Sequence, residues 1–259
     1  MACLWFARRS IAISDMDTTS DGLLNHRIKI EQPKYGYRVA VDTVLLAAAV
    51  PVQAGDRVLD LGCGVGGVML CLATRVPGIS AVGVEIQDEL AELARRNIQG
   101  NALQADLKIL QGDVTSLSLG NNFDHALMNP PYHDEARHDV SAHDGKRTAN
   151  TEKEGDLPVW MERAALALKS SGMLTLIHRA DRVEEILGYG KKLFGATEIL
   201  TILPKAGAAA KRVIIRFRKE GQGIRRCRDF VLHKPDGGYS DEAEKILREA
   251  EALRFIEAN

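Results

Sequence analysis

The stretch VLDLGCGVGG (residues 58–67) decides the fold, because an apolar strand pattern runs directly into closely spaced glycines. The segment Arg57–Leu61 is typical of a short buried strand, and residues 68–76, which follow the glycines, have a helical pattern. Glycines between a strand and a helix let a ligand touch the backbone, because no Cβ stands in its way. We therefore expect a ligand-binding turn at the carboxyl end of this strand.

From this turn onward, strand patterns alternate with helical patterns, which predicts an α/β fold. We expect a doubly wound, mostly parallel seven-stranded sheet between two layers of helices. The last two strands have no helix between them, so they predict an antiparallel hairpin at the sheet edge. The strands are expected at residues 57–61, 79–86, 107–110, 123–128, 173–178, 197–203 and 212–217, and the helices at 44–50, 68–76, 88–98, 158–168, 183–194 and 241–256.

The composition is that of an ordinary globular protein, since 45% of the 259 residues are hydrophobic and 27% are charged. No apolar run approaches the roughly 18 residues of a membrane span. Four scattered cysteines form neither a Cys-x-x-Cys pair nor a zinc-type cluster, which predicts reduced thiols in a cytoplasmic protein without a metal site. We expect residues 1–22 to be a disordered extension, with Met1 or Met16 as the start, and residues 23–259 to form one domain.

Two acidic residues accompany the glycines of the turn. Asp60 precedes them on the first strand, and Glu85 ends the second strand, where an acid can bind ribose hydroxyls. Because NAD and S-adenosylmethionine both contain a ribose, Glu85 does not distinguish between these two cofactors.

The run from Asp60 to Gly66 resembles motif I of the class I S-adenosylmethionine-dependent methyltransferases, D-x-G-x-G-x-G. This resemblance implies a Rossmann-like class I methyltransferase fold with S-adenosylmethionine as the cofactor. That class usually places an acid near the adenine amino group after the third strand, where Asp113 stands; in the alternative interpretation Asp113 only caps a loop. The residues expected to bind the cofactor through this motif are Asp60, Gly62, Gly64, Gly66, Glu85 and Asp113.

The tetrapeptide Asn129-Pro130-Pro131-Tyr132 follows the fourth strand directly. Two prolines fix the backbone, so the Asn129 side-chain oxygen and the Pro130 carbonyl can accept the two hydrogens of one planar NH₂ group. Tyr132 offers a flat face for stacking. This motif resembles the N-P-P-[YF] motif of methyltransferases that act on planar exocyclic nitrogens, either adenine N6 or glutamine N5. We expect Asn129, Pro130 and Tyr132 to be catalytic.

Two further segments, QPKYGYRVAVDTVLLA (residues 32–47) and FVLHKPDGGYS (residues 230–240), narrow the resemblance. With the Asn-Pro-Pro-Tyr motif, they resemble the bacterial tRNA (adenine-N6)-methyltransferase family that modifies the anticodon loop of a valine tRNA. The resemblance covers residues 23–250 approximately, and it implies N6-methylation of an adenine in RNA. It also places Thr43 beside the cofactor, although Thr43 could equally be the N-cap of a helix over residues 44–50.

Positive charge is concentrated near the C-terminus. Residues 205–234 contain ten Lys and Arg against two acids, a net charge of +8, whereas the rest of the chain carries −9. Such a basic segment predicts contact with the phosphates of RNA, although charge can also protect an edge strand from aggregation. The predicted nucleic-acid contacts are Lys211, Arg212, Arg216, Arg218, Arg225 and Arg226, of which Arg216 and Arg218 share one strand face.

Other functions stay open at the level of sequence. The alternatives are a glutamine-N5 protein methyltransferase, a small-molecule O-methyltransferase, a hydride-transfer enzyme, and a protein that binds RNA and cofactor without turnover. The glutamine enzymes carry a helical domain before motif I, and here that region is short. The polar loop 134–154 predicts a mobile substrate loop or lid, and we expect its histidines not to form a metal site.

Overall fold

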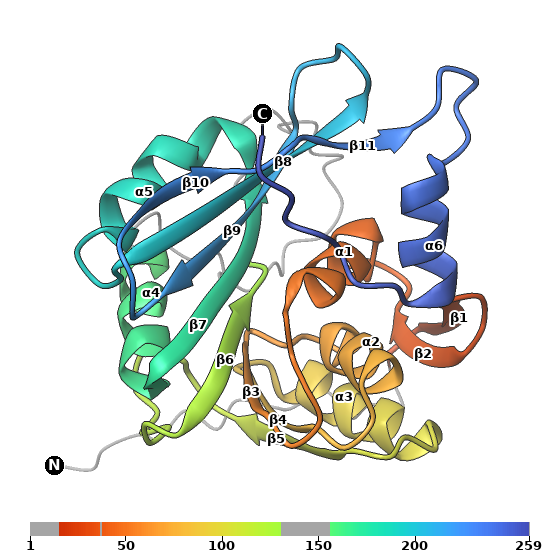
Figure 1. The fold of residues 1–259 in the computed structure, drawn as a ribbon. Helices are drawn as coiled ribbons and strands as arrows, with labels where there is room; N and C mark the ends of the chain where they lie inside the picture. The colour runs from red at the N-terminus through yellow and green to blue at the C-terminus, as the bar shows by residue number, and fades with distance from the viewer. Residues whose placement is uncertain (1–15, 37, 131–155, 259) are drawn as a thin grey trace, which may run out of the picture.

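The computed structural model describes residues 16–36, 38–130 and 156–258 (Figure 1). The predictions for Tyr132, for the loop 134–154 and for residues 1–15 lie outside these residues. The strands are β1 (Thr18–Leu23), β2 (Ile28–Pro33), β3 (Arg57–Leu61), β4 (Ser80–Glu85), β5 (Asp106–Gln111), β6 (Phe123–Met128), β7 (Leu168–Arg179), β8 (Ala196–Lys205), β9 (Arg212–Arg218), β10 (Gly223–Arg226) and β11 (Phe230–His233). The helices are α1 (Val41–Ala49), α2 (Gly67–Arg75), α3 (Asp88–Gly100), α4 (Asp156–Ala167), α5 (Val183–Gly190) and α6 (Asp241–Glu249), with a 3₁₀ turn at Ala180–Arg182.

The main sheet confirms the predicted α/β, doubly wound, Rossmann-like architecture. Its strand order is β10-β8-β9-β7-β6-β3-β4-β5, with β11 also paired to β8. Strands β3 to β7 are parallel, whereas β9 runs antiparallel to both β7 and β8, which makes β8 and β9 the predicted hairpin.

The sheet has nine strands in the described part of the chain, where seven were expected. The additional strands, β10 and β11, have four residues each and pair in parallel with β8. Without them, β8 of the hairpin would be the edge strand of the sheet. Strands this short carry too little alternation of apolar residues to be recognised in the sequence.

Two hydrophobic cores lie on the two faces of the sheet. One gathers Leu45 of α1, Met69 of α2 and Leu93 of α3, and the other gathers Met161 of α4 and Ile186 of α5. The cores divide along β3, where neighbouring residues point to opposite faces. The sheet is therefore covered on both sides by helices, as Figure 1 shows.

The first ordered element begins earlier than the sequence predicted. We expected residues 1–22 to be a disordered extension, but Thr18–Leu23 forms β1 and pairs antiparallel with β2. The hairpin is held by its β2 face, where Ile28 and Ile30 are fully buried. These two buried residues join a core built by distant helices, and that contribution is invisible in the local sequence.

The last helix ends earlier than the sequence predicted. A helix was expected over 241–256, but α6 ends at Glu249, and Ala250 is left-handed with φ 62°. Beyond Ala250 the chain packs against other elements. The Leu253 N–H donates to the Ala48 carbonyl at 2.9 Å, and Glu257 forms an isolated antiparallel β-bridge with Cys227. Leu253 of this tail is therefore buried and Phe255 is half-buried, instead of prolonging the helix.

Candidate active site

The ends of four parallel strands bring the predicted site residues together. In the sheet, Leu61 of β3 is in register with Met128 of β6 and with Val84 of β4, and Glu85 of β4 is in register with Gln111 of β5. Parallel strands end at a common edge. The glycine turn, Asn129, Glu85 and Asp113 follow or end these strands, so the structure places them along the carboxyl edge, where doubly wound sheets bind ligands.

The glycine turn is fixed in a conformation that needs glycine. Gly62, Gly64 and Gly66 have φ values of 71°, 55° and 84°, in the left-handed region. A Cβ on Gly62 would lie 2.7 Å from the ring of Trp160, so this glycine is also required by packing. A Cβ on Gly64 would meet no atom within 4 Å, which leaves the space over its backbone open to a ligand.

Glu85 holds the glycine turn in place. Its carboxylate is buried and accepts hydrogen bonds at 2.9 Å from the Gly64 and Gln87 N–H groups. Burial raises the pKa of Glu85, and these backbone donors partly offset that rise. A carboxylate has about four acceptor positions, so Glu85 can position the turn and still accept hydrogen bonds from ribose hydroxyls. The latter role stays a prediction.

Asp60 is a buried acid that lacks a full set of partners. Within the described residues, its Oδ2 has no hydrogen-bond partner. Burial, together with the negative charge of Glu85, raises the pKa of Asp60 to about 8. A buried polar atom without a partner is costly, which points to a ligand that supplies a donor or a positive charge.

These features fit S-adenosylmethionine. The cofactor carries an ammonium group, which the unpartnered Asp60 carboxylate can attract. It also carries ribose hydroxyls, which can donate hydrogen bonds to Glu85. The open space over Gly64 leaves room for close approach to the backbone. The residues at this edge would therefore hold the cofactor between the ends of β3 and β4.

Replacing Asp60 by asparagine should stabilise the free protein while weakening cofactor binding. The folded protein holds a proton on Asp60 up to pH 8 approximately, whereas an unfolded chain loses it near the ordinary pKa of 3.8. The stability of the wild-type protein therefore falls as pH rises through this interval, and Asp60→Asn lacks that loss. Thermal unfolding from pH 5 to 9, with and without S-adenosylmethionine, measures both effects. A variant that follows the wild type at every pH would contradict the buried carboxylate argument.

Thr43 lies close to the end of the glycine turn, and its predicted contact with the cofactor stays a prediction. It is buried on α1, and a Cβ on Gly67 would lie 3.1 Å from its Cγ2. The alternative, that Thr43 caps a helix, is wrong: α1 begins at Val41, and Ala40 is its N-cap. The helix starts one turn earlier than expected because no proline or glycine interrupts residues 40–43.

Asp113 has the structural role that the alternative interpretation gave it. Its Oδ1 accepts hydrogen bonds from the N–H of Thr115 at 2.7 Å and from the Thr115 hydroxyl at 2.8 Å, which closes a turn after β5. Its position at the carboxyl edge is compatible with a contact to the adenine of the cofactor. That contact stays a prediction.

Asn129 and Pro130 stand directly after β6. Asn129 is half-buried and Pro130 is buried. Since β6 pairs with β3, both residues lie one strand away from the glycine turn. The structure thus brings the residues predicted to bind the methyl-accepting amino group next to the predicted cofactor site, and their catalytic roles stay a prediction.

Arg216 is not available to nucleic acid, so this part of the predicted basic surface is wrong. Its side chain is buried, its Nε donates to the Ala49 carbonyl at 2.8 Å, and its guanidinium lies 3.5 Å from the centroid of the Phe255 ring. It also pairs with Glu198 at 3.4 Å. Arg216 sits under α1 and the C-terminal tail, and elements so distant in sequence could not be anticipated from strand alternation.

The other predicted contacts are divided between the two ends of the sheet. Since β9 is antiparallel to β7, Lys211 and Arg212 lie at the carboxyl edge, beside Arg179. Arg218 is exposed at the opposite end of β9.

Several of these arginines pair with acids in the described part of the chain. Arg212 pairs with Asp42 at 2.8 Å, Arg226 pairs with Glu184 at 3.5 Å, and Arg225 pairs with Glu198. The side chain of Lys211, at the carboxyl edge, is exposed to solvent.

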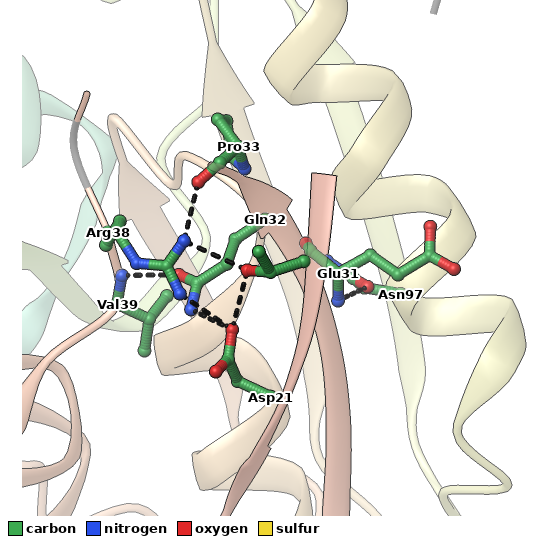
Figure 2. Close-up of polar contacts among 8 residues, drawn as sticks. Asp21, Glu31, Gln32, Pro33, Arg38, Val39 and Asn97 are labelled. Atoms are coloured by element: carbon green, nitrogen blue, oxygen red, sulfur yellow. Dashed lines mark hydrogen bonds and ion pairs between the residues drawn. The ribbon is translucent and has the colours of Figure 1, made fainter. Parts of the chain in front are cut away.

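Two residues at the site were missed by the sequence analysis. Trp160 of α4 covers Gly62, and Asn97 of α3 joins the glycine turn to the N-terminal hairpin. Asn97 accepts the Glu31 N–H at 2.7 Å and donates to the Val65 carbonyl at 3.0 Å (its bond to Glu31 is drawn in Figure 2). A polar residue on the buried face of an amphipathic helix was the available signal for Asn97.

No three of the His, Cys, Asp and Glu side chains in the described part of the chain lie close enough together to hold a metal ion. No helix within the same residues is both long and apolar enough to cross a membrane.

Comparison with known proteins shows the family of this chain. Residues 37–202 match the model of the methyltransferase small domain family. A curated tRNA1(Val) (adenine(37)-N6)-methyltransferase from Porphyromonas gingivalis (strain ATCC 33277) is 33% identical over 85% of this chain and 91% of the relative.

Solved structures agree on the fold. A predicted O-methyltransferase from Agrobacterium tumefaciens has a TM-score of 0.69 and 26% identity, over 82% of this chain and 98% of that one. A 16S rRNA N2 G1207 methyltransferase from T. thermophilus, solved with AdoMet and guanosine, has a TM-score of 0.57 and 22% identity, over 79% of this chain and 50% of that one. The predicted cofactor, S-adenosylmethionine, is confirmed by the methyltransferase family. The chain belongs to the methyltransferase small domain family and, within it, to the family of the tRNA1(Val) (adenine(37)-N6)-methyltransferases.

Proposed function

We propose that this protein transfers a methyl group from S-adenosylmethionine to N6 of an adenine in the anticodon loop of a tRNA. The observation that carries the proposal is the placement of Asn129 and Pro130 at the end of β6, one strand from the glycine turn. Membership of a family whose curated relatives are named for this reaction supports it. Because tRNA is used in translation, we place the protein in the cytoplasm.

The difficulty of the reaction is that the adenine amino group is a poor nucleophile, since its lone pair is delocalised into the ring. The Asn129 side-chain oxygen and the Pro130 carbonyl would each accept one hydrogen of this group. Holding both hydrogens localises the lone pair on nitrogen and fixes its direction. The bound cofactor supplies an electrophilic methyl group on a positively charged sulfur. The chain therefore contributes positioning and electrostatics, and the proton released from N6 passes to solvent.

The RNA must present an unstacked base to this edge of the sheet. Bases in a loop are already partly exposed, so an anticodon loop costs less to open than a duplex. Lys211 and Arg212 lie at the same edge and can meet the phosphates that flank the base. Arg218 lies at the far end of β9, and its predicted RNA contact is not required by this arrangement.

Replacing Lys211 by glutamate should weaken RNA binding and flatten its salt dependence. Removal of one phosphate contact lowers the slope of log affinity against log salt by about 1. Lys192→Glu makes the same charge change at an exposed position after α5, next to the amino end of β8, and serves as the matched control. Filter binding of a tRNA stem–loop from 50 to 300 mM salt measures the slope. Equal slopes for the two variants would contradict a phosphate contact at Lys211.

The reaction itself is tested with methyl-labelled S-adenosylmethionine. Purified protein is incubated in parallel with unmodified tRNA and with a release-factor protein, and the labelled product is identified. We expect label in tRNA only. Label in glutamine of the protein would instead establish the glutamine-N5 reaction, and bound cofactor without label in either would indicate a protein without this turnover.

A further inference from the structure

A short loop at the open end of the N-terminal hairpin is pinned at both ends. The Lys34 N–H donates to the Asp17 carbonyl at 2.9 Å, and the Val39 N–H donates to the Gln32 side-chain oxygen at 2.8 Å. The Arg38 guanidinium donates to the Pro33 carbonyl at 2.8 Å, closing the loop across its base (Figure 2). The chain therefore leaves β2 at Lys34, and Arg38 lies again within hydrogen-bond reach of it.

The Arg38 anchor is itself held by a carboxylate. Asp21 pairs with Arg38 at 2.8 Å, and it accepts further hydrogen bonds from Gln32 at 2.8 Å and from the Thr19 hydroxyl at 2.9 Å. The bond from Gln32 is the main cause that lowers the pKa of Asp21, and those from Thr19 and Arg38 add to it. The anchor is thus charged at neutral pH and joins both strands of the hairpin, as Figure 2 shows.

The pinned loop lies at the carboxyl edge of the main sheet. At its end, Val39 packs against the start of α2, since a Cβ on Gly67 would lie 2.9 Å from Val39 Cγ2. The chain then enters α1, whose Asp42 pairs with Arg212 at the edge of β9. The residues that directly follow the loop therefore contact the start of α2, after the glycine turn, and the basic residues at the end of β9.

This loop presents an aromatic ring to solvent. Tyr35 is 75% exposed, the highest value among the large hydrophobic side chains exposed in the described residues. The Lys34 ammonium lies 5.4 Å from the centroid of its ring. An exposed ring with a cation beside it matches the way proteins bind single-stranded nucleic acid, where rings stack on bases and cations meet phosphates.

We propose that Tyr35 is a stacking platform for an RNA base next to the methylated adenine, with Lys34 meeting the adjoining phosphate. This inference rests on the proposed function. An adenine that enters the site leaves its neighbour with an uncovered face, and Tyr35 replaces the lost stacking partner. Because the loop is anchored before RNA binds, little conformational entropy is lost on stacking.

The test compares Tyr35→Ala with Tyr35→Phe in the full-length protein. An unmodified tRNA stem–loop is the probe, and its Kd and KM are measured together with the Kd for S-adenosylmethionine. Because the ring is lost as a stacking partner, Tyr35→Ala should raise Kd and KM for RNA about tenfold. Tyr35→Phe keeps the ring and should stay close to the wild type. Neither change should alter cofactor affinity or melting temperature.

Ile224→Ala is the matched control. Ile224 is 61% exposed on β10, on the far side of the hairpin β8–β9 from the site, so the change removes exposed apolar surface away from the carboxyl edge. An unchanged RNA Kd for Tyr35→Ala would overturn the proposal. An equal loss in Tyr35→Phe would also overturn it, because the hydroxyl and not the ring would then be the contact.

The binding measurement separates this inference from the proposed function. The Kd for the stem–loop needs no turnover, so it is informative even if the wild-type protein fails to methylate RNA. In that case the proposed function fails, and a tenfold loss of affinity in Tyr35→Ala alone would still support stacking.

Discussion

Asn129→Ala should lower kcat for RNA methylation by about 10²–10³, the loss typical of removing one preorganised polar group from an active site. Without the side-chain oxygen, one hydrogen of the adenine amino group has no acceptor, and the lone pair stays delocalised. Cofactor affinity should be nearly unchanged, because the glycine turn is held by Glu85 and not by Asn129. Steady-state kinetics and equilibrium binding of S-adenosylmethionine measure the two quantities.

Asn122→Ala is the control for this prediction. Asn122 is exposed and precedes β6, so the same substitution is made at the opposite end of the same strand. It should have wild-type kinetics. A parallel loss of cofactor affinity and rate in Asn129→Ala would show that the residue belongs to the cofactor site instead.

Arg216→Ala should cost about 1–3 kcal/mol of unfolding free energy, the range for leaving a buried hydrogen-bonding group without its partner. The change leaves the Ala49 carbonyl without its Nε donor and removes a cation from the face of Phe255. It also loosens the contact between α1 and the sheet. Chemical denaturation measures this loss of stability.

Arg218→Ala tests the same strand at an exposed position, two residues further on, and should change stability by less than about 0.5 kcal/mol. A folded Arg216→Ala protein with wild-type stability and weak RNA binding would restore the original hypothesis that this arginine contacts RNA.

The parts of the fold predicted from sequence are those with strong local signals. The turn from Asp60 to Gly66 combines a buried strand, left-handed glycines and a following helix, and each feature is readable within a few residues. The parallel sheet with helices on both faces follows from the alternation of strand and helix patterns, whereas the order of its strands comes from the structure. Asn129 was found in the same way, because Asn-Pro-Pro-Tyr directly follows a strand pattern.

The parts that were missed depend on contacts distant in sequence. Arg216 is separated from its acceptor, Ala49, by 167 residues, so no local pattern distinguishes it from the exposed Arg218. The helix α6 stops at Glu249 because the tail beyond it binds α1. The hairpin β1–β2 is fixed by Asn97 on α3, which again lies far along the chain.

The central claim is that the carboxyl edge of this sheet presents an adenine amino group to S-adenosylmethionine through Asn129. The most direct measurement is nucleoside analysis of tRNA after reaction with the wild-type protein and with Asn129→Ala. The account predicts N6-methyladenosine from the wild type and almost none from the variant. N6-methyladenosine at equal levels from both proteins, or a methyl group on a different nucleoside, would contradict it.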